Sequence, residues 1–551
     1  MLARHYKLLL LRVLLCHIPR NTAAMSCFPW SENPIKKKFA LGYLRGAARG
    51  RLRYTNIAPC GNRDDGATGH EAHQQPPISC LQEISPNDRH VSTYEALLTT
   101  YLFDVGYSCS PECGYCRRTR ESQSPNRHSY YAVATSLTPA FYQSLVDRCW
   151  RRSGTLLYRP NQKSSCCPHY TLRLDSTQFK PTKDQRQAIN RFNRHVIGEA
   201  YAKEAARTHP LSREEARKRD NEFDLVARIA EPELRSLRTP PQPAHEFTVT
   251  LEEDAFTDEK FDLFENYQRL VHHEPPDKIS QGSFRRFLCA STLTRGAMVG
   301  ENGKKRMLGS YHMCYRLDGK LVAMGVLDLL PDCVSAVYFL YHESIRSFQP
   351  GKLGALREIS LALEYGYRWW YSGFYIHSCP KMRYKVDYSP QYVLDPETLE
   401  WDLLDREALA IFDKKPYVSL SRERREREEG YIRAEQAEEA SAPEQPGEKG
   451  TDVDGEDDEE PTSENDALFS SGMPGIPSLD EMEALDMGDV LIRSDFSDNY
   501  FVASQLVVWE TETIRGRSLK ARIAELVAAI GPHLRDQYCV DFRKSAREIG
   551  G

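Results

Sequence analysis

The sequence predicts an α+β protein with an N-terminal cysteine-rich metal-binding domain and a C-terminal domain built on a mixed β-sheet. Two observations carry this prediction. Four cysteines fall into two pairs in the first third of the chain, and strand-like and helix-like patterns alternate between residues 247 and 376. With 551 residues, of which 40% are hydrophobic, the chain is long enough for two or three domains of about 100 to 200 residues each.

The charge is unevenly distributed, although the net value is only -5. Residues 1–60 contain eleven Lys or Arg and one acid, whereas residues 447–466 contain ten acids and one Lys. The remainder is mildly acidic, so the overall charge does not by itself predict a nucleic-acid-binding protein.

Hydropathy and cysteine content limit the cellular compartments in which we expect the protein. No apolar run approaches the ~18 residues that span a bilayer, so we expect no membrane-spanning segment. Fifteen scattered cysteines, an odd number, favour a reducing compartment. We therefore expect a cytoplasmic protein, with the nucleus as an additional location. Mitochondrial or secretory targeting is less favoured, because Arg12 interrupts the apolar stretch 8–16.

The composition divides the chain into four expected parts. Residues 1–90 are a basic leader without sustained periodicity, which we expect to be disordered. Residues 91–240 form the N-terminal domain with the metal site. Residues 241–420 and 486–551 form the C-terminal domain, and residues 421–485 are a charged, largely disordered insertion.

The ordered elements of the N-terminal domain are short strands followed by a long helix. Residues 131–137 and 155–158 are predicted strands around cysteine-bearing loops. Thr182 and Gln185 form a capping-box pattern that starts a helix reaching about Ala206.

The C-terminal domain alternates strands and helices in a defined order. We predict a strand at 247–251, a helix at 257–271, a hairpin of 309–317 and 321–329 around Asp318-Gly319, a strand at 335–341, a helix at 353–368 and a strand at 370–376. This is the order found in GNAT-type (acyl-CoA N-acyltransferase-like) folds, although order alone is weak evidence of function.

Two further segments bear on that fold. In it, the loop that corresponds to 349–355 cradles the phosphates of an acyl carrier with backbone N–H groups. Its glycines do not match the usual acetyl-CoA signature, which points to a different carrier. The strand expected at 501–509 and the helix at 519–530 should return to the C-terminal domain.

The cysteine pairs predict the metal site. Cys113 and Cys116 form a CxxC turn, and Cys166 and Cys167 are adjacent. Such thiolates suit tetrahedral zinc or an iron–sulfur cluster, and the sequence does not separate the two. The alternative is a structural or redox CxxC with buried free cysteines.

Five motifs in a fixed order now identify a family. They are Cys113-Gly-Tyr-Cys116, Tyr130-Tyr-Ala-Val133, Ser165-Cys-Cys-Pro168, Phe179-Lys-Pro-Thr-Lys-Asp-Gln-Arg186, and Phe374-Tyr-Ile-His-Ser-Cys-Pro-Lys-Met-Arg-Tyr-Lys385. The chain from about Tyr94 to His533 resembles arginyl-tRNA–protein transferases in these motifs. The leader and the insertion depart from the family pattern.

The resemblance implies that arginyl-tRNA is a co-substrate and that arginine passes to proteins beginning with Asp, Glu or oxidised Cys. It further implies that this addition marks them for ubiquitin-dependent degradation, which makes ubiquitin-ligase pathway components candidate partners. Cys113, Cys116, Cys166 and Cys167 match the metal or cluster ligands of the family.

The reaction itself needs few catalytic groups, because the aminoacyl ester is already activated. The guanidinium of the donor needs a carboxylate, for which Asp328 and Glu358 are candidates. Asp328 is also a candidate proton acceptor, and a turn cap before Pro331 is its structural alternative. We expect Cys379 to be a packing residue rather than a nucleophile.

Three basic residues are candidates for substrate binding. In an extended segment Lys381, Arg383 and Lys385 would share one face, with Arg383 clamping the acidic acceptor and the lysines binding tRNA phosphates. A solvated basic edge is the alternative.

Aromatic residues near these cations complete the predicted site. Tyr375, His377 and Tyr384 are suited to stack on the terminal adenine, and we list Tyr375 and His377 with Asp328 as catalytic candidates. His312 matches a family position and is a further substrate-binding candidate.

Two other functions remain open at this point. A CoA-dependent N-acyltransferase on the same fold would bind acetyl-CoA and need no tRNA. A non-catalytic, metal-bearing reader of acidic N-termini would bind such peptides without transferring anything to them.

Overall fold

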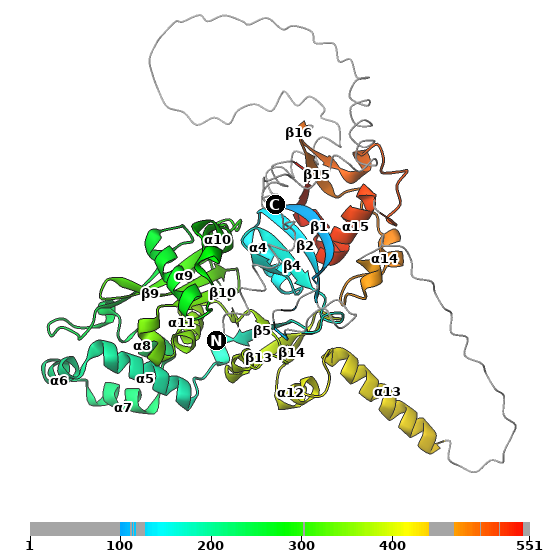
Figure 1. Cartoon of the computed structure of the whole chain (residues 1–551). Helices are drawn as coiled ribbons and strands as arrows, with labels where there is room; N and C mark the ends of the chain where they lie inside the picture. Colours follow the sequence, from blue (N-terminus) through cyan, green and yellow to red (C-terminus); the bar gives the residue numbers. More distant parts are fainter. Residues whose placement is uncertain are drawn as a thin grey trace, which may run out of the picture.

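The computed structural model describes residues 100–110, 113, 115–116, 127–300, 303–439, 468–495, 497–516 and 518–543. The predicted leader, 1–90, lies outside the described residues. The fold is mixed α/β, with two mixed sheets of seven and ten strands that are flanked by helices (Figure 1).

The seven-stranded sheet has the order β16-β15-β17-β1-β2-β4-β3. Helix α4 (Pro139–Val146) and helix α15 (Leu519–Ile530) pack with it into one core, in which Trp150 is fully buried. The strands are β1 (Tyr101–Ser110), β2 (Arg127–Ser136), β3 (Arg151–Ser153), β4 (Leu156–Pro160), β15 (Leu491–Ser494), β16 (Ser497–Val502) and β17 (Cys539–Asp541).

The C-terminal segment belongs to this first sheet, which differs from our prediction. We expected residues 486–551 to return to the C-terminal domain, but β17 runs parallel to both β1 and β15. The strand expected at 501–509 ends at Val502 in β16. Apolar pattern predicts that such segments are buried, but it does not predict which distant sheet they join.

The ten-stranded sheet has the order β14-β13-β5-β11-β10-β9-β8-β6, with β12 paired to β5 and β7 to β8. Its strands are β5 (Tyr170–Asp175), β6 (Phe247–Glu253), β7 (Gly296–Val299), β8 (Lys305–Leu317), β9 (Lys320–Leu329), β10 (Cys333–Tyr341), β11 (Trp369–Tyr371), β12 (Phe374–Tyr375), β13 (Gln391–Leu394) and β14 (Trp401–Leu403). Strand β5 reaches this sheet from the predicted N-terminal domain.

Local signals placed most elements of this sheet correctly. Asp318 and Gly319 turn the β8–β9 hairpin with φ of 52° and 78°. Thr182 and Gln185 form the predicted capping box of helix α5 (Lys183–Ile197), and Gly198 separates it from helix α6 (Glu199–Thr208).

Helices cover both faces of the ten-stranded sheet. Helix α11 (Pro350–Tyr365) packs on one face with α5 and α8 (Leu225–Ala230). Helices α9 (Asp258–Leu270) and α10 (Gln281–Phe284) lie on the opposite face. There Phe264 and Met324 share a core with Tyr131 and Tyr158 of the first sheet, so this core joins the two sheets.

The insertion is better ordered at its described ends than we expected. Helix α13 (Leu420–Glu439) occupies the first part of the charged segment, and residues 440–467 lie outside the described part. Leu468, Met473 and Met482 are buried in the core of the first sheet, the last of them in helix α14 (Leu479–Glu483). The predicted disorder through residue 485 is therefore wrong for 468–485, because these apolar side chains anchor the segment.

The remaining helices are short. They are α7 (Arg213–Asn221) and α12 (Arg406–Phe412), whose Ala408 and Phe412 are buried in the cluster around Cys113 and Cys167. Within the described ranges, no helix is both long and apolar enough to cross a membrane.

Candidate active site and metal centre

The four predicted cysteine ligands come together in space. The thiol sulfurs of Cys113, Cys116, Cys166 and Cys167 all lie within 4.8 Å of one another. The sulfurs of Cys116 and Cys166 are 3.5 Å apart. Hydrogen bonds from Cys166 and Cys167 lower the pKa of Cys113 well below its ordinary value, which favours the thiolate that a metal ion binds.

The donor set fits a metal centre. Four thiolates around one tetrahedral zinc ion, with Zn–S bonds of about 2.3 Å, would have sulfurs about 3.8 Å apart. Cys113 and Cys167 are buried, and Cys116 and Cys166 are half-buried. The site therefore combines the correct ligands with partial exclusion of water.

The metal site is packed against the loop after β12. Ser378 Oγ lies 3.9 Å from Cys167 Sγ. The His169 ring packs edge-on against Tyr115 and Phe374, with centroids 5.3 and 5.4 Å apart. His169 thus connects the cysteine site to Phe374, which lines the pocket described next.

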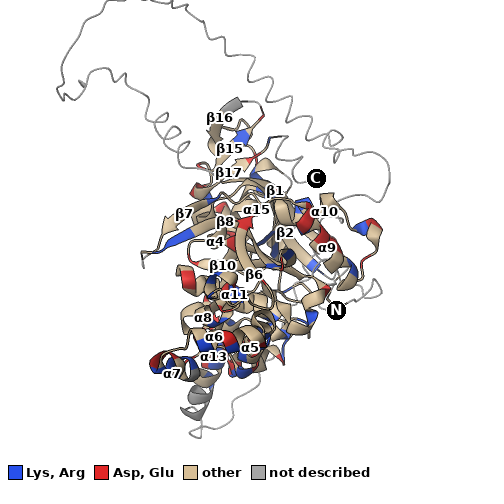
Figure 2. Ribbon diagram, turned by 90° about the vertical axis from the view of Figure 1, so that its left-hand side faces the viewer, with Lys and Arg blue, Asp and Glu red and all other residues tan. Residues whose placement is uncertain are grey.

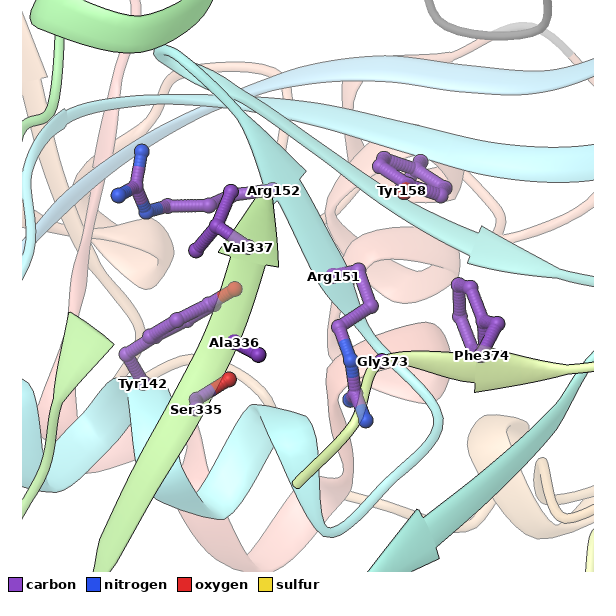
Figure 3. Close-up of a pocket in the computed structure, with 9 residues that line it drawn as sticks. All are labelled: Tyr142, Arg151, Arg152, Tyr158, Ser335, Ala336, Val337, Gly373 and Phe374. Carbon is purple, nitrogen blue, oxygen red and sulfur yellow. The ribbon is translucent and has the colours of Figure 1, made fainter. Parts of the chain in front are cut away.

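A strand split creates a pocket between the two sheets. Strands β10 and β11 pair in parallel only from Cys333 to Ser335. At Gly373, where φ is 79°, the chain leaves β10, and β12 keeps only the pairing with β5 that β11 also makes. The gap beside β10 opens toward β3 of the first sheet (Figure 3).

The pocket is small and partly cationic. It is lined by Tyr142, Arg151, Arg152, Tyr158, Ser335, Ala336, Val337, Gly373 and Phe374. It holds about 370 Å³ of space between atoms, some of it open to solvent, but the centre of a water molecule can move through only about 20 Å³. The pocket therefore accepts the end of a side chain rather than a large ligand.

Arg152 and Asp328 form a buried ion pair between the two sheets. Arg152 Nε donates to Asp328 Oδ2 at 2.8 Å, Nη2 donates to Oδ1, and Nη2 also donates to Ser310 Oγ at 2.9 Å. Asp328 is 0% exposed. Both roles predicted for Asp328 need an unpaired carboxylate, so this geometry does not support them. The predicted cap before Pro331 is not observed either.

Glu358 and Lys385 lie buried near the split. Glu358 accepts a 2.9 Å hydrogen bond from Trp370 Nε1, and burial raises its pKa to about 7. Lys385 Nζ donates to the carbonyls of Ser372 and Phe374, on either side of Gly373. Burial, followed by the charge of Arg151, lowers the Lys385 pKa to about 7. Lys385 is thus a buried amine that holds the strand break, and the prediction that it binds tRNA phosphates is not supported.

The predicted basic face is absent because the segment is not extended. Residues Arg383–Asp387 form a 3₁₀ helix, which turns Lys385 inward while Arg383 remains exposed. Arg383 Nη2 donates to Asp413 Oδ1 at 3.1 Å, so its guanidinium is already engaged. Lys381 is half-buried. Tyr384 is 47% exposed, yet burial around its hydroxyl raises its pKa to about 12.

Tyr375 and His377 face the cysteine site instead of the pocket. Phe374 lines the pocket, and Tyr375, the next residue of the strand, packs among the residues around Cys113 and Cys167. The Tyr375 hydroxyl lies 2.7 Å from His377 Nδ1, and His377 Nε2 lies 2.9 Å from Asp413. Tyr375 is 1% exposed, so it is not positioned to stack on a nucleobase.

His312 and Cys379 occupy packed positions. His312 is fully buried, its Nε2 lies 3.0 Å from the Leu288 carbonyl, and burial lowers its pKa to about 4. This geometry favours a structural role over the predicted substrate contact. Cys379 is buried among apolar side chains around the cysteine site, as a packing residue would be.

The fold and the site define a protein with four cysteines arranged to hold a metal ion beside a small cationic pocket, and comparisons with known proteins give its family. Residues 111–187 match the family model described as Arginine-tRNA-protein transferase, N terminus, and residues 259–395 match the corresponding C-terminus model. The chain belongs to the arginyl-tRNA–protein transferase family.

Individual relatives agree with this assignment. Arginyl-tRNA–protein transferase 1 of Drosophila melanogaster is 28% identical over 413 residues, covering 56% of this chain and 84% of the relative. The Saccharomyces cerevisiae protein of the same name is 31% identical over 271 residues, covering 46% and 49%. An aspartate/glutamate leucyltransferase of Pseudomonas fluorescens is 27% identical over 255 residues, covering 45% and 77%.

Arg151 and Arg152 were not among the site residues predicted from the sequence. Their only signal was two consecutive arginines in Cys149-Trp-Arg-Arg-Ser153 before a predicted strand. Alternation along a strand predicts that the two side chains point to opposite faces, as Figure 3 shows. The pattern does not predict that both are buried, because the second sheet that covers them is distant in sequence.

Proposed function

We propose that the chain transfers arginine from arginyl-tRNA to the α-amino group of proteins that begin with Asp, Glu or oxidised Cys, which marks them for ubiquitin-dependent degradation. The observation that carries the proposal is the match of both family models, in order, to segments that build the metal site and the strand split. The relative named aspartate/glutamate leucyltransferase supports acidic acceptors, since its name states them while its donor differs.

The split between β10 and β12 supports a GNAT-like arrangement. In such folds the activated carrier enters beside the late helix and its acyl group reaches the gap between two diverging strands. Here the N-terminus of α11 follows β10, and Gln349 at its cap has φ of 60° without a side-chain cap bond. Packing explains the glycine at position 354, because a Cβ on Gly354 would lie 2.3 Å from the Phe339 ring.

The chemical step needs a neutral amine at the ester. The α-amino nitrogen of the acceptor attacks the ester carbonyl carbon, the new C–N bond forms, the C–O bond breaks, and the terminal ribose oxygen of the tRNA leaves with a proton. The α-amine has a reference pKa of about 8, so a modest base suffices. Glu358, which is buried near the split and accepts a hydrogen bond from Trp370 Nε1, is our candidate for this base once the bound substrates open the split to it.

We place the tRNA backbone on helix α5. Lys183, Arg186, Arg191 and Arg194 are exposed on one face of this helix, and among the described residues none of the four forms an ion pair. From Lys183 to Arg194 the face is about 16 Å long. Figure 2 shows α5 beside α6 at one end of the molecule, and Lys352 of α11 pairs with Asp184 at the start of α5. This face can therefore neutralise phosphates leading toward the start of α11.

We assign a structural role to the metal at the four cysteines. The sulfur spacing fits one tetrahedral ion such as zinc better than a four-iron cluster, in which each thiolate binds a different iron. When bound, the ion would cross-link the thiolates that border β2 and β5. The rings of His169 and Phe374 pack edge-on and so connect the cysteine site to the wall of the pocket.

Purified protein tests the proposal directly. Labelled arginine, free or charged on tRNA, is incubated with the protein and with peptides that differ only in beginning with Asp, Glu or Ala. We expect label in the Asp and Glu peptides with charged tRNA alone. Transfer of an acetyl group from acetyl-CoA without tRNA, or binding of acidic peptides without any transfer, would replace our proposal with one of the two alternatives.

A further inference from the structure

The strand split contains a buried guanidinium that lacks a counter-ion. Arg151 lies on β3 and is 6% exposed. Its Nη1 donates to the carbonyls of Trp150 and Val146, at 2.7 and 3.3 Å. Its Nε and Nη2 are buried and make no hydrogen bond, and no described carboxylate lies within ion-pair distance of Arg151.

The unused edge of Arg151 has the geometry of a carboxylate receptor. Nε and Nη2 form the side of a guanidinium that presents two parallel N–H groups. The next residue, Arg152, uses the same two nitrogens to hold both oxygens of Asp328. Adjacent arginines on one strand thus offer the same fork, occupied in one and empty in the other.

The surroundings of Arg151 favour an incoming anion. The guanidinium lies 5.0 Å from the centroid of Phe374 in the pocket (Figure 3). The nearby amine of Lys385 adds positive potential. Asp147, an acid near Arg151, accepts a 2.6 Å hydrogen bond from Tyr371, and burial raises its pKa. Its carboxylate is therefore already engaged by another side chain.

A buried cation without a partner costs stability, so a bound anion is the physical reason to keep one. The space for water-sized groups, about 20 Å³, accommodates a carboxylate at the end of a short side chain. A phosphate of the tRNA backbone would bring its ribose neighbours into a gap that does not hold them.

We propose that Arg151 recognises the side-chain carboxylate of the acceptor's N-terminal Asp or Glu by a bidentate contact in the β10–β12 split. Arg151 takes the specificity role that the sequence assigned to Arg383, whose guanidinium is exposed and engaged by Asp413. This inference rests on the proposed function. The acceptor's α-amine then stays at the mouth of the split, where the aminoacyl ester can reach it.

The test compares Arg151→Met with the wild type on peptides that begin with Asp and with its uncharged isostere Asn. Losing a buried bidentate charge pair should lower kcat/KM for the Asp peptide by at least about 30-fold and leave that for the Asn peptide within about threefold. Arg151→Lys keeps the positive charge but lacks the two parallel N–H groups. Its kcat/KM for the Asp peptide should therefore lie between those of the wild type and Arg151→Met. Arg515→Met, at an exposed arginine that pairs with Glu483 outside the pocket, is the control.

Binding measurements separate recognition from folding and from the donor. Calorimetry without tRNA should show the Asp peptide binding at least about 30-fold more weakly to Arg151→Met, while arginyl-tRNA binding is unchanged. A ratio of kcat/KM for the Asp peptide to kcat/KM for the Asn peptide that equals the wild-type ratio would overturn the inference, as would an equal loss of binding for both peptides. If Arg151→Met does not fold, the same kcat/KM ratio measured in Arg151→Lys tests the inference instead. A wild type that transfers arginine to neither peptide would instead refute the proposed function.

Discussion

Replacing Arg152 with Met should destabilise the protein strongly, and the loss should depend on pH. The substitution leaves the Asp328 carboxylate buried at 0% exposure without its only cation. Removing one partner of a buried pair typically costs about 3 to 5 kcal/mol. Protonation limits the cost, because neutralising a carboxyl of reference pKa ~3.9 takes about 4 kcal/mol at pH 7 and about 1.5 kcal/mol at pH 5.

Urea unfolding followed by tryptophan fluorescence at both pH values measures this loss, since Trp150 is buried next to β3. We expect a penalty of about 4 kcal/mol at pH 7 that falls by about half or more at pH 5. The exposed pair Arg207–Glu204 provides the control, and Arg207→Met should leave the free energy of unfolding almost unchanged. A penalty that is small at pH 7, or equal at both pH values, would refute the reasoning.

The double variant Arg152→Met with Asp328→Leu separates structure from catalysis. Replacing both charges with apolar groups should recover most of the stability, because no buried charge then lacks a partner. If Asp328 only connects the sheets, arginine transfer recovers with stability. A stable but inactive double variant would restore the catalytic role that the sequence suggested for Asp328.

Three further predictions concern Glu358, the cysteines and helix α5. Because burial raises the Glu358 pKa from 4.5 to about 7, the folded state keeps a proton that the unfolded state releases, and stability falls as pH rises through this window. Glu358→Gln should remove a loss of about 3 kcal/mol between pH 4.5 and 8 in urea titrations, and an unchanged pH profile would contradict the raised pKa. Cys113→Ser should lower the bound metal measured by elemental analysis, whereas Cys539→Ser, at a cysteine remote from the site, should not; equal metal content in both would contradict the assignment. Arg194→Ala should reduce the slope of log affinity for arginyl-tRNA against log salt by about 0.7 to 1, whereas a slope equal to that of the wild type would place the tRNA elsewhere.

Local chemistry explains which parts of the fold were predictable. The capping box at Thr182 and the turn at Asp318-Gly319 depend on neighbouring residues, and both were found as predicted. The strand expected at 370–376 breaks at Gly373, because the chain leaves β10 there and keeps only its pairing with β5. The sequence pattern alone does not reveal the loss of that partner strand.

The candidate site, like the fold, could be predicted only where it depends on residues that are close in sequence. The four cysteines were identified because ligand type and spacing are local properties, and they converge as expected. Arg383 and Lys385 were placed on one face by assuming an extended backbone, which the 3₁₀ helix rules out. Arg151 was missed because its importance depends on a sheet formed more than 180 residues later in the chain.

The position of the metal site suggests how the pocket keeps its shape. Arg151 comes from the seven-stranded sheet, whereas Ser335 and Phe374 come from the ten-stranded sheet, so the pocket depends on how the sheets are held together. Two connections flank it, the Arg152–Asp328 pair and the cysteines. Cys113 and Cys116 lie between β1 and β2 of the first sheet, whereas Cys166 and Cys167 lie where the chain passes from β4 to β5 and thus between sheets.

A metal ion at the cysteines would therefore fix the crossing from one sheet to the other. Displacements of about 1 Å at a reacting centre can lower a rate by about a hundredfold. Loss of the metal should consequently reduce arginine transfer more than it reduces the helix content seen by circular dichroism, because most helices pack in cores that do not contain the cysteines. Parallel loss of both would show that the site is needed for folding as a whole. Full activity without metal would show that the Arg152–Asp328 pair and the core shared by the two sheets hold the pocket in shape.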